Sequence, residues 1–300
     1  MGGLVSQGGL VKNYSARYSL PIGGDGLSAG CDFSSVTYKL SGEYSSLDST
    51  GETKTSAAWV SYPIIKKEAM ELSVSAGIAD KRMKDEIKTV NTSISKNSHS
   101  FYISSSFNRF WEYAEFGADM SANIGKLYFK DEFSLDNDKR GADTAGAYGR
   151  VNVGAKLSVK TSSNSNITFG AKAQKAMFRK NLDGAEDFSI AGVSGVRAYP
   201  SGEYSAENGY LLSISQSYRP LFLGSINGAF GLFADYGRGY VEKNIALMQA
   251  KALSDVGASF SAYAYGAFLK LEIAKIIGGE RIASERHVDT RALLQAGYEF

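Results

Sequence analysis

Residues 147–159, AYGRVNVGAKLSV, alternate between two chemically different faces along the chain. Every odd position from Ala147 to Val159 is apolar or small, whereas most even positions, from Tyr148 to Ser158, carry polar side chains. Successive side chains of a β-strand point to opposite faces of its sheet, so this period of two is typical of a strand with one apolar and one polar face. The stretch predicts a β-strand and gives the pattern to seek in the rest of the chain.

The same alternation recurs from one end of the chain to the other. It is clear at 112–124, where Ala114 and Phe116 oppose Glu115, and again at 70–78. Spacing typical of helices is almost absent, so we predict an all-β, antiparallel fold. Thirteen strands are expected, at 12–21, 26–38, 54–63, 69–80, 99–110, 112–128, 146–161, 165–176, 209–219, 226–240, 255–264, 266–277 and 291–300.

The composition of the 300 residues argues against several kinds of site. The formal net charge of +2, from 33 Lys and Arg against 31 Asp and Glu, gives no electrostatic case for binding nucleic acid. Cys31 is the only cysteine, and His99 and His287 are the only histidines, so neither a disulfide framework nor a metal site is expected. The glycines at 23, 24 and 26 suit a hairpin turn rather than a phosphate-binding loop, and we expect no cofactor.

The connections between the predicted strands sort into two kinds. Short turns alternate with long polar loops, as expected for an outer-membrane barrel with short periplasmic turns and long external loops. The short turns lie near 21–25, 65–67, 111, 162–165, 221–224 and 265. The long loops lie near 39–53, 81–98, 129–145, 177–208, 241–254 and 278–290.

The two-faced strands favour a barrel that crosses a membrane. In hydrocarbon every backbone polar group needs an internal partner, so only helices and closed barrels can span, and no stretch here reaches the roughly 18 apolar residues that a membrane helix requires. We expect the apolar face to contact outer-membrane lipid and the polar face to line a wet lumen, which places the protein in the outer membrane of a Gram-negative-type bacterium. Tyrosines near the strand ends suit interfacial girdles, namely Tyr14, Tyr18, Tyr62, Tyr102, Tyr113, Tyr236 and Tyr240.

The last predicted strand ends on an aromatic residue. Counting back from Phe300, Tyr298, Ala296 and Leu294 share its outward face. This ending resembles the C-terminal signal by which the barrel-assembly machinery recognises outer-membrane barrels. We therefore expect Tyr298 and Phe300 to form an assembly signal, with that machinery as a partner during biogenesis.

Two short motifs give the chain a family resemblance. Residues 195–203 read GVRAYPSGE, and 233–237 read FADYG. In this order and spacing they closely resemble the loop signature VRAYPxGE and the strand pattern FxDxG of the two-partner secretion transporters, outer-membrane translocators of haemolysins and haemagglutinins. Segments upstream, at 38–48, 61–65 and 80–86, also look like early barrel strands of this family, so the resemblance covers essentially the whole chain.

The resemblance implies a sixteen-stranded barrel, of which the thirteen strands would be the fourth to the last. Residues 1–300 are then one transmembrane barrel domain that is incomplete at its N-terminal edge, with residues 1–6 as the tail of the third strand. A signal peptide and two periplasmic polypeptide-transport-associated domains would precede it in the family and are not in this sequence. Ser215 and Ser217 stand where the family usually has Glu and Arg, a departure that affects a salt-bridge network and not the fold.

The resemblance also implies that loop 177–208 folds back into the lumen, with Arg197 against Asp235. Parity agrees, because Asp235 falls on the polar face of its predicted strand, and a guanidinium can donate two parallel hydrogen bonds to a carboxylate. The expected latch and transport residues of the loop are Val196, Arg197, Ala198, Tyr199, Pro200, Gly202 and Glu203. The expected partner motif on the lumen wall is Phe233, Asp235 and Gly237.

These features predict a translocator that secretes a large exoprotein of haemolysin or adhesin type from the periplasm to the cell surface without nucleotide hydrolysis. A barrel-assembly factor of the same superfamily and a general porin are the alternatives. An enzyme is disfavoured, because neither His99, expected in or beside a loop, nor His287, in the last loop, has an evident Ser and carboxylate constellation.

Overall fold

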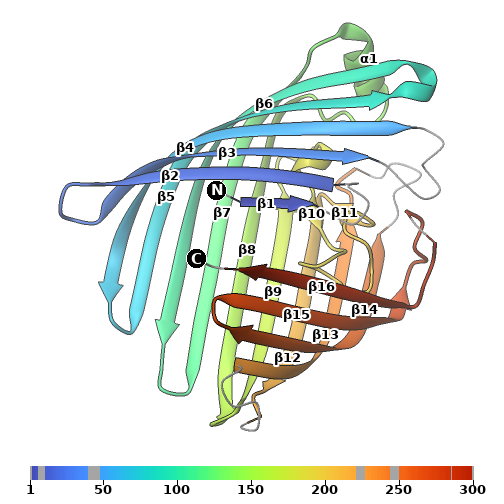
Figure 1. The fold of residues 1–300 in the computed structure, drawn as a ribbon. Helices are drawn as coiled ribbons and strands as arrows, with labels where there is room; N and C mark the ends of the chain where they lie inside the picture. The colour runs from blue at the N-terminus through green and yellow to red at the C-terminus, as the bar shows by residue number, and fades with distance from the viewer. Residues whose placement is uncertain are drawn as a thin grey trace.

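The part of the chain that the structure describes forms one large antiparallel sheet of fourteen strands, which curls round on itself, and one small two-stranded sheet (Figure 1). The computed structural model describes residues 2–5, 11–39, 48–220, 227–243, 250–284 and 286–298. Each strand of the sheet pairs with its neighbours in chain order, except that the segment between β9 and β12 leaves the sheet. The strands are β1 (Gly2–Val5), β2 (Val11–Ile22), β3 (Leu27–Lys39), β4 (Ser49–Lys67), β5 (Met70–Ile87), β6 (Thr92–Phe110), β7 (Ala114–Phe129), β8 (Gly146–Ser162), β9 (Ser165–Ala176), β12 (Asn208–Tyr218), β13 (Asn227–Tyr240), β14 (Lys251–Ala264), β15 (Ala267–Gly279) and β16 (Thr290–Tyr298).

Each of the thirteen predicted strands has a counterpart, and β1 is a fourteenth. It pairs with β2, with Gly2 opposite Ser15, in the stretch where the family resemblance implied the tail of a preceding strand. Figure 1 shows the sheet curving until β1 and β16, the first and last strands in hydrogen-bonding order, lie on the same side of the molecule. The fold is therefore an all-β, antiparallel barrel.

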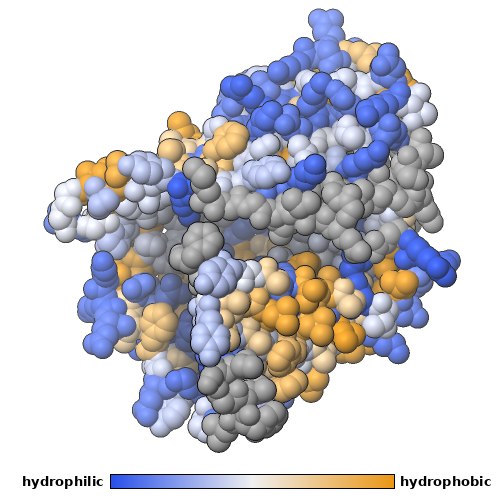
Figure 2. Space-filling view, viewed as in Figure 1, coloured by the Kyte–Doolittle hydropathy of each residue, from blue (hydrophilic) through white to orange (hydrophobic). Residues whose placement is uncertain are grey.

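The two faces of the strands have opposite chemistry, as the alternation predicted. On β13, Phe233 and Asp235 are buried inside the curve, whereas Leu232, the residue before Phe233, is 64% exposed on the outside. Apolar side chains on β15 and β16, such as Ile273 and Leu294, are likewise exposed, and Figure 2 shows hydrophobic atoms gathered over this part of the outer surface. An exterior of this kind suits contact with lipid, while the polar set faces the interior.

The predicted long loop at 81–98 is wrong, because most of it is strand. β5 continues to Ile87 and β6 starts at Thr92, with only the short 3-10 helix η3 (Lys88–Val90) near the turn. The backbone ladder persists there, with Lys84 opposite Ser95, although polar residues occupy both faces. Backbone pairing does not need apolar side chains, so the hydrophobic alternation ended several residues before the strands did.

The long connection at 129–145 contains a helix that the sequence did not reveal, α1 (Glu132–Arg140). Its N-cap is Asp131, whose carboxylate accepts a hydrogen bond from the backbone N–H of Ser134 at 2.7 Å. The helix is short and mostly polar, so it has no apolar stripe to detect. Among the described residues, no helix has the length and apolar character needed to cross a membrane.

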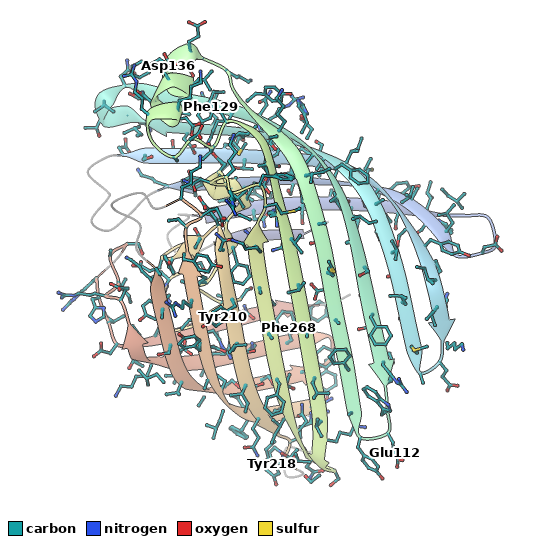
Figure 3. All side chains as sticks on the ribbon, turned by 180° about the vertical axis from the view of Figure 1, so that it is seen from behind. Glu112, Phe129, Asp136, Tyr210, Tyr218 and Phe268 are labelled. Atoms are coloured by element: carbon teal, nitrogen blue, oxygen red, sulfur yellow. The ribbon has the colours of Figure 1, made fainter. Side chains whose placement is uncertain are left out.

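The two kinds of connection lie at opposite ends of the sheet. Figure 3 shows Glu112, in the short turn after β6, and Tyr218, at the end of β12, at one end of the molecule. Phe129 and Asp136, at the start of a long connection, lie at the other. The predicted turn at 221–224 and parts of the loops at 39–53 and 241–254 fall outside the described residues.

The expectations for Tyr102 and His99 were wrong, and of the expected assembly signal only Tyr298 lies among the described residues. Tyr102 lies on the inward face of β6, opposite Gly77, and so is not part of a lipid-facing girdle. His99 lies within β6 rather than in a loop, with its Nδ1 2.9 Å from an oxygen of Asp80. Tyr298 is 62% exposed at the end of β16, whereas Phe300 falls outside the described residues.

Candidate functional site: a loop held inside the barrel

The segment between β9 and β12 folds into the interior of the barrel. Its stem is a small hairpin in which β10 (Phe188–Ser189) pairs with β11 (Ser205–Ala206), seen inside the curve of the sheet in Figure 1. Ile190 and Val196 are completely buried. We call residues 177–207 the inserted loop.

Arg197 lies near the tip of the inserted loop and binds two carboxylates on the barrel wall. Its Nε and Nη2 donate to the two oxygens of Asp235 at 2.7 and 3.1 Å, and its Nη1 donates to Glu272 on β15 at 2.6 Å. Asp235 and Glu272 are 4% and 1% exposed. A buried, bidentate pair of this kind is screened little by solvent, so it fixes the position of the loop more firmly than a surface pair could.

The partner motif on β13 contacts the loop through alternate residues. The Phe233 ring lies under the guanidinium of Arg197, with Cζ 3.4 Å from the ring centroid. Two residues on, Asp235 binds the same group. Gly237 follows, and a Cβ there would lie only 2.5 Å from Cγ2 of Ile190. Alternate residues of a strand point to the same face, so all three face the loop. Phe233 stacks on Arg197, Asp235 binds its charge, and Gly237 leaves room for Ile190.

The residues beside Arg197 are also held. The backbone N–H of Ala198 donates to Asp255 on β14 at 2.6 Å, and Val196 packs in the buried cluster with Leu211 and Phe233. Tyr199 is 1% exposed, and its hydroxyl lies 3.4 Å from the carbonyl oxygen of Gly278. Pro200 is buried next to it.

The end of the signature ties the inserted loop to the last long loop. Gly202 has a φ of +86°, which an L side chain rarely adopts, in the turn before Glu203. The carboxylate of Glu203 accepts hydrogen bonds from the backbone N–H groups of Ala283 and Ser284 at 2.7 and 3.1 Å, and from the hydroxyl of Ser284. Glu203 therefore connects two loops that lie far apart in the sequence.

The sequence did not single out Glu272 or Asp255, which are both on the wall. Each stands as one acidic residue in its strand, and only the register of β13, β14 and β15 brings both to the part of the wall that Arg197 and Ala198 contact. Asp255 is directly opposite Asp235, and Glu272 faces Ser259 on the same side of β14. The alternation of each strand could have placed both carboxylates on the lumen face. It could not have identified their partners, Arg197 for Glu272 and the Ala198 N–H for Asp255.

Carboxylates also gather in the stem of the inserted loop. The pKa of Asp187 is raised to about 7, chiefly by burial and also by the nearby charges of Glu207 and Asp183. The pKa of Glu207 is raised as well, chiefly by burial. Among the described residues, no group of three or more His, Cys, Asp or Glu is placed to hold a metal ion.

The fold and the site define an antiparallel barrel of outer-membrane type with an arginine-bearing loop docked on its inner wall. The family model for haemolysin secretion/activation proteins of the ShlB/FhaC/HecB type matches residues 6–261. The chain belongs to this family, the two-partner secretion transporters, and is an outer-membrane protein of a Gram-negative bacterium.

Curated relatives and solved structures agree with this family. The heme/hemopexin transporter protein HuxB of Haemophilus influenzae strain 86-028NP is 24% identical over 287 residues, which cover 92% of this chain and 50% of HuxB. The chain thus spans about half the length of the curated relatives that it matches.

Solved barrels share the fold at low sequence identity. CdiB from Escherichia coli has a TM-score of 0.76 and 18% identity over 95% of this chain and 52% of CdiB. BamA from Haemophilus ducreyi lacking POTRA domains 1–3 has a TM-score of 0.63 and 12% identity over 96% of this chain and 62% of BamA.

Proposed function

We propose that this chain is the pore of a transporter that moves a large, unfolded exoprotein of haemolysin or adhesin type from the periplasm to the cell surface. The inserted loop restricts the lumen and moves aside when the exoprotein passes. The observation that carries this proposal is the Arg197 pair with Asp235 and Glu272, which holds a long loop inside a barrel of this family. Folding of the exoprotein outside the cell drives transport, with no nucleotide hydrolysis.

The lumen wall supports passage of an extended polypeptide. One row of residues across β3 to β7 consists of serines that stand opposite one another in register, namely Ser28, Ser61, Ser75, Ser104 and Ser121. On β5, Ser75 shares its face with Lys81, which contacts the inserted loop, so the row lines the interior. Hydroxyl groups both donate and accept hydrogen bonds, so an uncharged row can contact any backbone without holding one sequence.

Export of a co-expressed exoprotein by the complete transporter tests the proposal. Cells that carry the intact loop should release the exoprotein, whereas cells without the transporter should retain it in the periplasm. Retention in both strains would reject the secretion function.

The alternative of a barrel-assembly factor rests on the likeness of the fold to BamA. Depletion of the protein would then lower the amounts of many outer-membrane barrels rather than stop export of one exoprotein. The general porin predicts a third result, in which small solutes cross and no exoprotein leaves the cell.

A further inference from the structure

A second buried carboxylate of the inserted loop meets the wall from the side of β5 and β8. Glu186 ends the 3-10 helix η4 (Gly184–Glu186) and is 5% exposed. Its Oε1 is 2.5 Å from Nζ of Lys81 on β5, and its Oε2 accepts from Nε of Arg150 on β8 at 3.0 Å. The hydroxyl of Tyr148 adds a contact at 3.3 Å. Two cations and a hydroxyl thus surround one carboxylate.

The neighbours of Glu186 are fixed in the same place. Lys81 also donates to the carbonyl of Ala185 at 3.0 Å, and Lys96 on β6 binds Asp183 at 2.6 Å. The side-chain amide of Gln174 donates to the carbonyl oxygens of Glu186 and Glu207 at 2.9 and 3.0 Å. The side chains of Lys81, Lys96 and Arg150 are 18%, 14% and 25% exposed, so they form a largely buried basic pocket.

This basic pocket is distinct from the Arg197 site in position and in sign. Arg197 binds carboxylates on β13 and β15, whereas the pocket lies on β5, β6 and β8, on the other side of β9 and β12 in the sheet. At the first site the loop supplies the cation, and at the second it supplies the anions. The carboxylates of the Arg197 site would repel Glu186, and the basic pocket would repel Arg197. The charges of the two sites therefore also determine which half of the loop contacts which wall.

We propose that Glu186 is a second positioning residue of the inserted loop, seated in the basic pocket of Lys81, Lys96 and Arg150. The loop is then bound to two parts of the lumen wall, one on β5, β6 and β8 and the other on β13 and β15. If Arg197 alone leaves its site, the segment around Glu186 stays bound. The consequence for gating rests on the proposed function, but the anchor itself does not. Removing one partner of a buried pair leaves an uncompensated charge, so loss of either partner should weaken docking of the loop.

Hydrogen–deuterium exchange of the folded protein, without exoprotein, tests the anchor. In Glu186→Gln and in Lys81→Met, exchange in residues 180–189 should quicken about tenfold or more, as expected when a buried ion pair is lost. Residues 195–204, held by Arg197, should keep their protection. Lys81→Arg retains the charge and should keep most of the protection in 180–189. Heat-modifiable migration on a gel checks that each variant forms the barrel.

The matched control is Lys84→Gln, which removes an exposed partner of Glu86 on the same strand and should leave the loop unchanged. Because Glu186 and Lys81 share a contact, the double variant should release the loop by less than the sum of the two single variants. Unchanged exchange in both single variants, additive effects in the double variant, or an equal effect of Lys84→Gln would overturn the proposal. Export is measured separately. Faster exchange in 180–189 with normal export would support Glu186 as an anchor and would count against the proposal that the loop gates export.

Discussion

Asp235 and Asp255 lie directly opposite each other on β13 and β14, both are buried, and each binds a different part of the inserted loop. Asp235 takes the guanidinium of Arg197, whereas Asp255 takes the backbone N–H of Ala198. Like charges in directly opposed positions destabilise a sheet. The docked loop supplies the cation and the donor that this pair needs, so the loop and the wall stabilise each other.

Loss of the Arg197 side chain should release the tip of the loop. Arg197→Ala leaves Asp235 and Glu272 buried without their shared partner, which we expect to cost about 3–5 kcal/mol in the docked state. Arg197→Lys keeps the charge but cannot donate two parallel bonds, so its effect should be intermediate. Hydrogen exchange in residues 195–204 and export of the exoprotein measure both effects. Unchanged export in Arg197→Ala and Asp235→Ala would remove the latch from the mechanism.

The gap at Gly237 should be required for docking. A Cβ there would lie 2.5 Å from Cγ2 of Ile190 and 3.3 Å from Cγ2 of Val196, both completely buried. Overpacking of this kind costs about 1–3 kcal/mol, so Gly237→Ala should raise proteolysis of the inserted loop in the folded barrel. Gly24→Ala is the control, since nothing lies within 4 Å of a Cβ at that turn. Equal resistance of both variants to protease would show that the gap is dispensable.

The stem of the inserted loop should be more stable in acid. The pKa of Asp187 in the docked loop is about 7, above its ordinary value, so the docked state binds the proton more tightly than the released state. That contribution is fully present below about pH 4 and is lost as the pH rises through about 7. Exchange in residues 180–189, corrected for its intrinsic pH dependence, should therefore be slower at about pH 5.5 than at about pH 8.

Asp187→Asn provides the control for this pH dependence. The amide is neutral throughout the range, so the difference between the two pH values should shrink while the barrel stays folded. A difference of the same size in the variant would assign the effect to another group, such as Glu207, whose pKa is also raised.

A charge in the serine row should slow transport. Ser104 stands between Ser75 and Ser121 on the lumen wall. Ser104→Arg places a cation where carboxylates of a passing chain can pair with it, so export of an acidic exoprotein should slow, whereas Ser104→Thr keeps the hydroxyl and should not slow it. The rate of appearance of exoprotein in the medium measures this. Equal rates for the two variants would mean that the chain does not pass along this row.

The sequence by itself determined the strands, their faces and the inward position of Asp235. Alternation with a period of two is a local property, because the backbone of each strand turns successive side chains to opposite sides whatever the rest of the chain does. The limits of the strands were less well determined. The ladder of β5 and β6 continues to Ile87 and Thr92 through a stretch with polar residues on both faces, where the alternation gives little signal.

Only the tertiary structure decided the contacts of Glu272 and Glu186. Arg197 reaches Glu272 across 75 positions, and Glu186 reaches Lys81 across 105. These partners come together through the register of many strands and the curvature of the sheet, which no local pattern encodes. A single Glu or Lys on a strand looks the same in sequence whether it is solvated or holds a loop, because burial and a partner of opposite charge are properties of the folded chain.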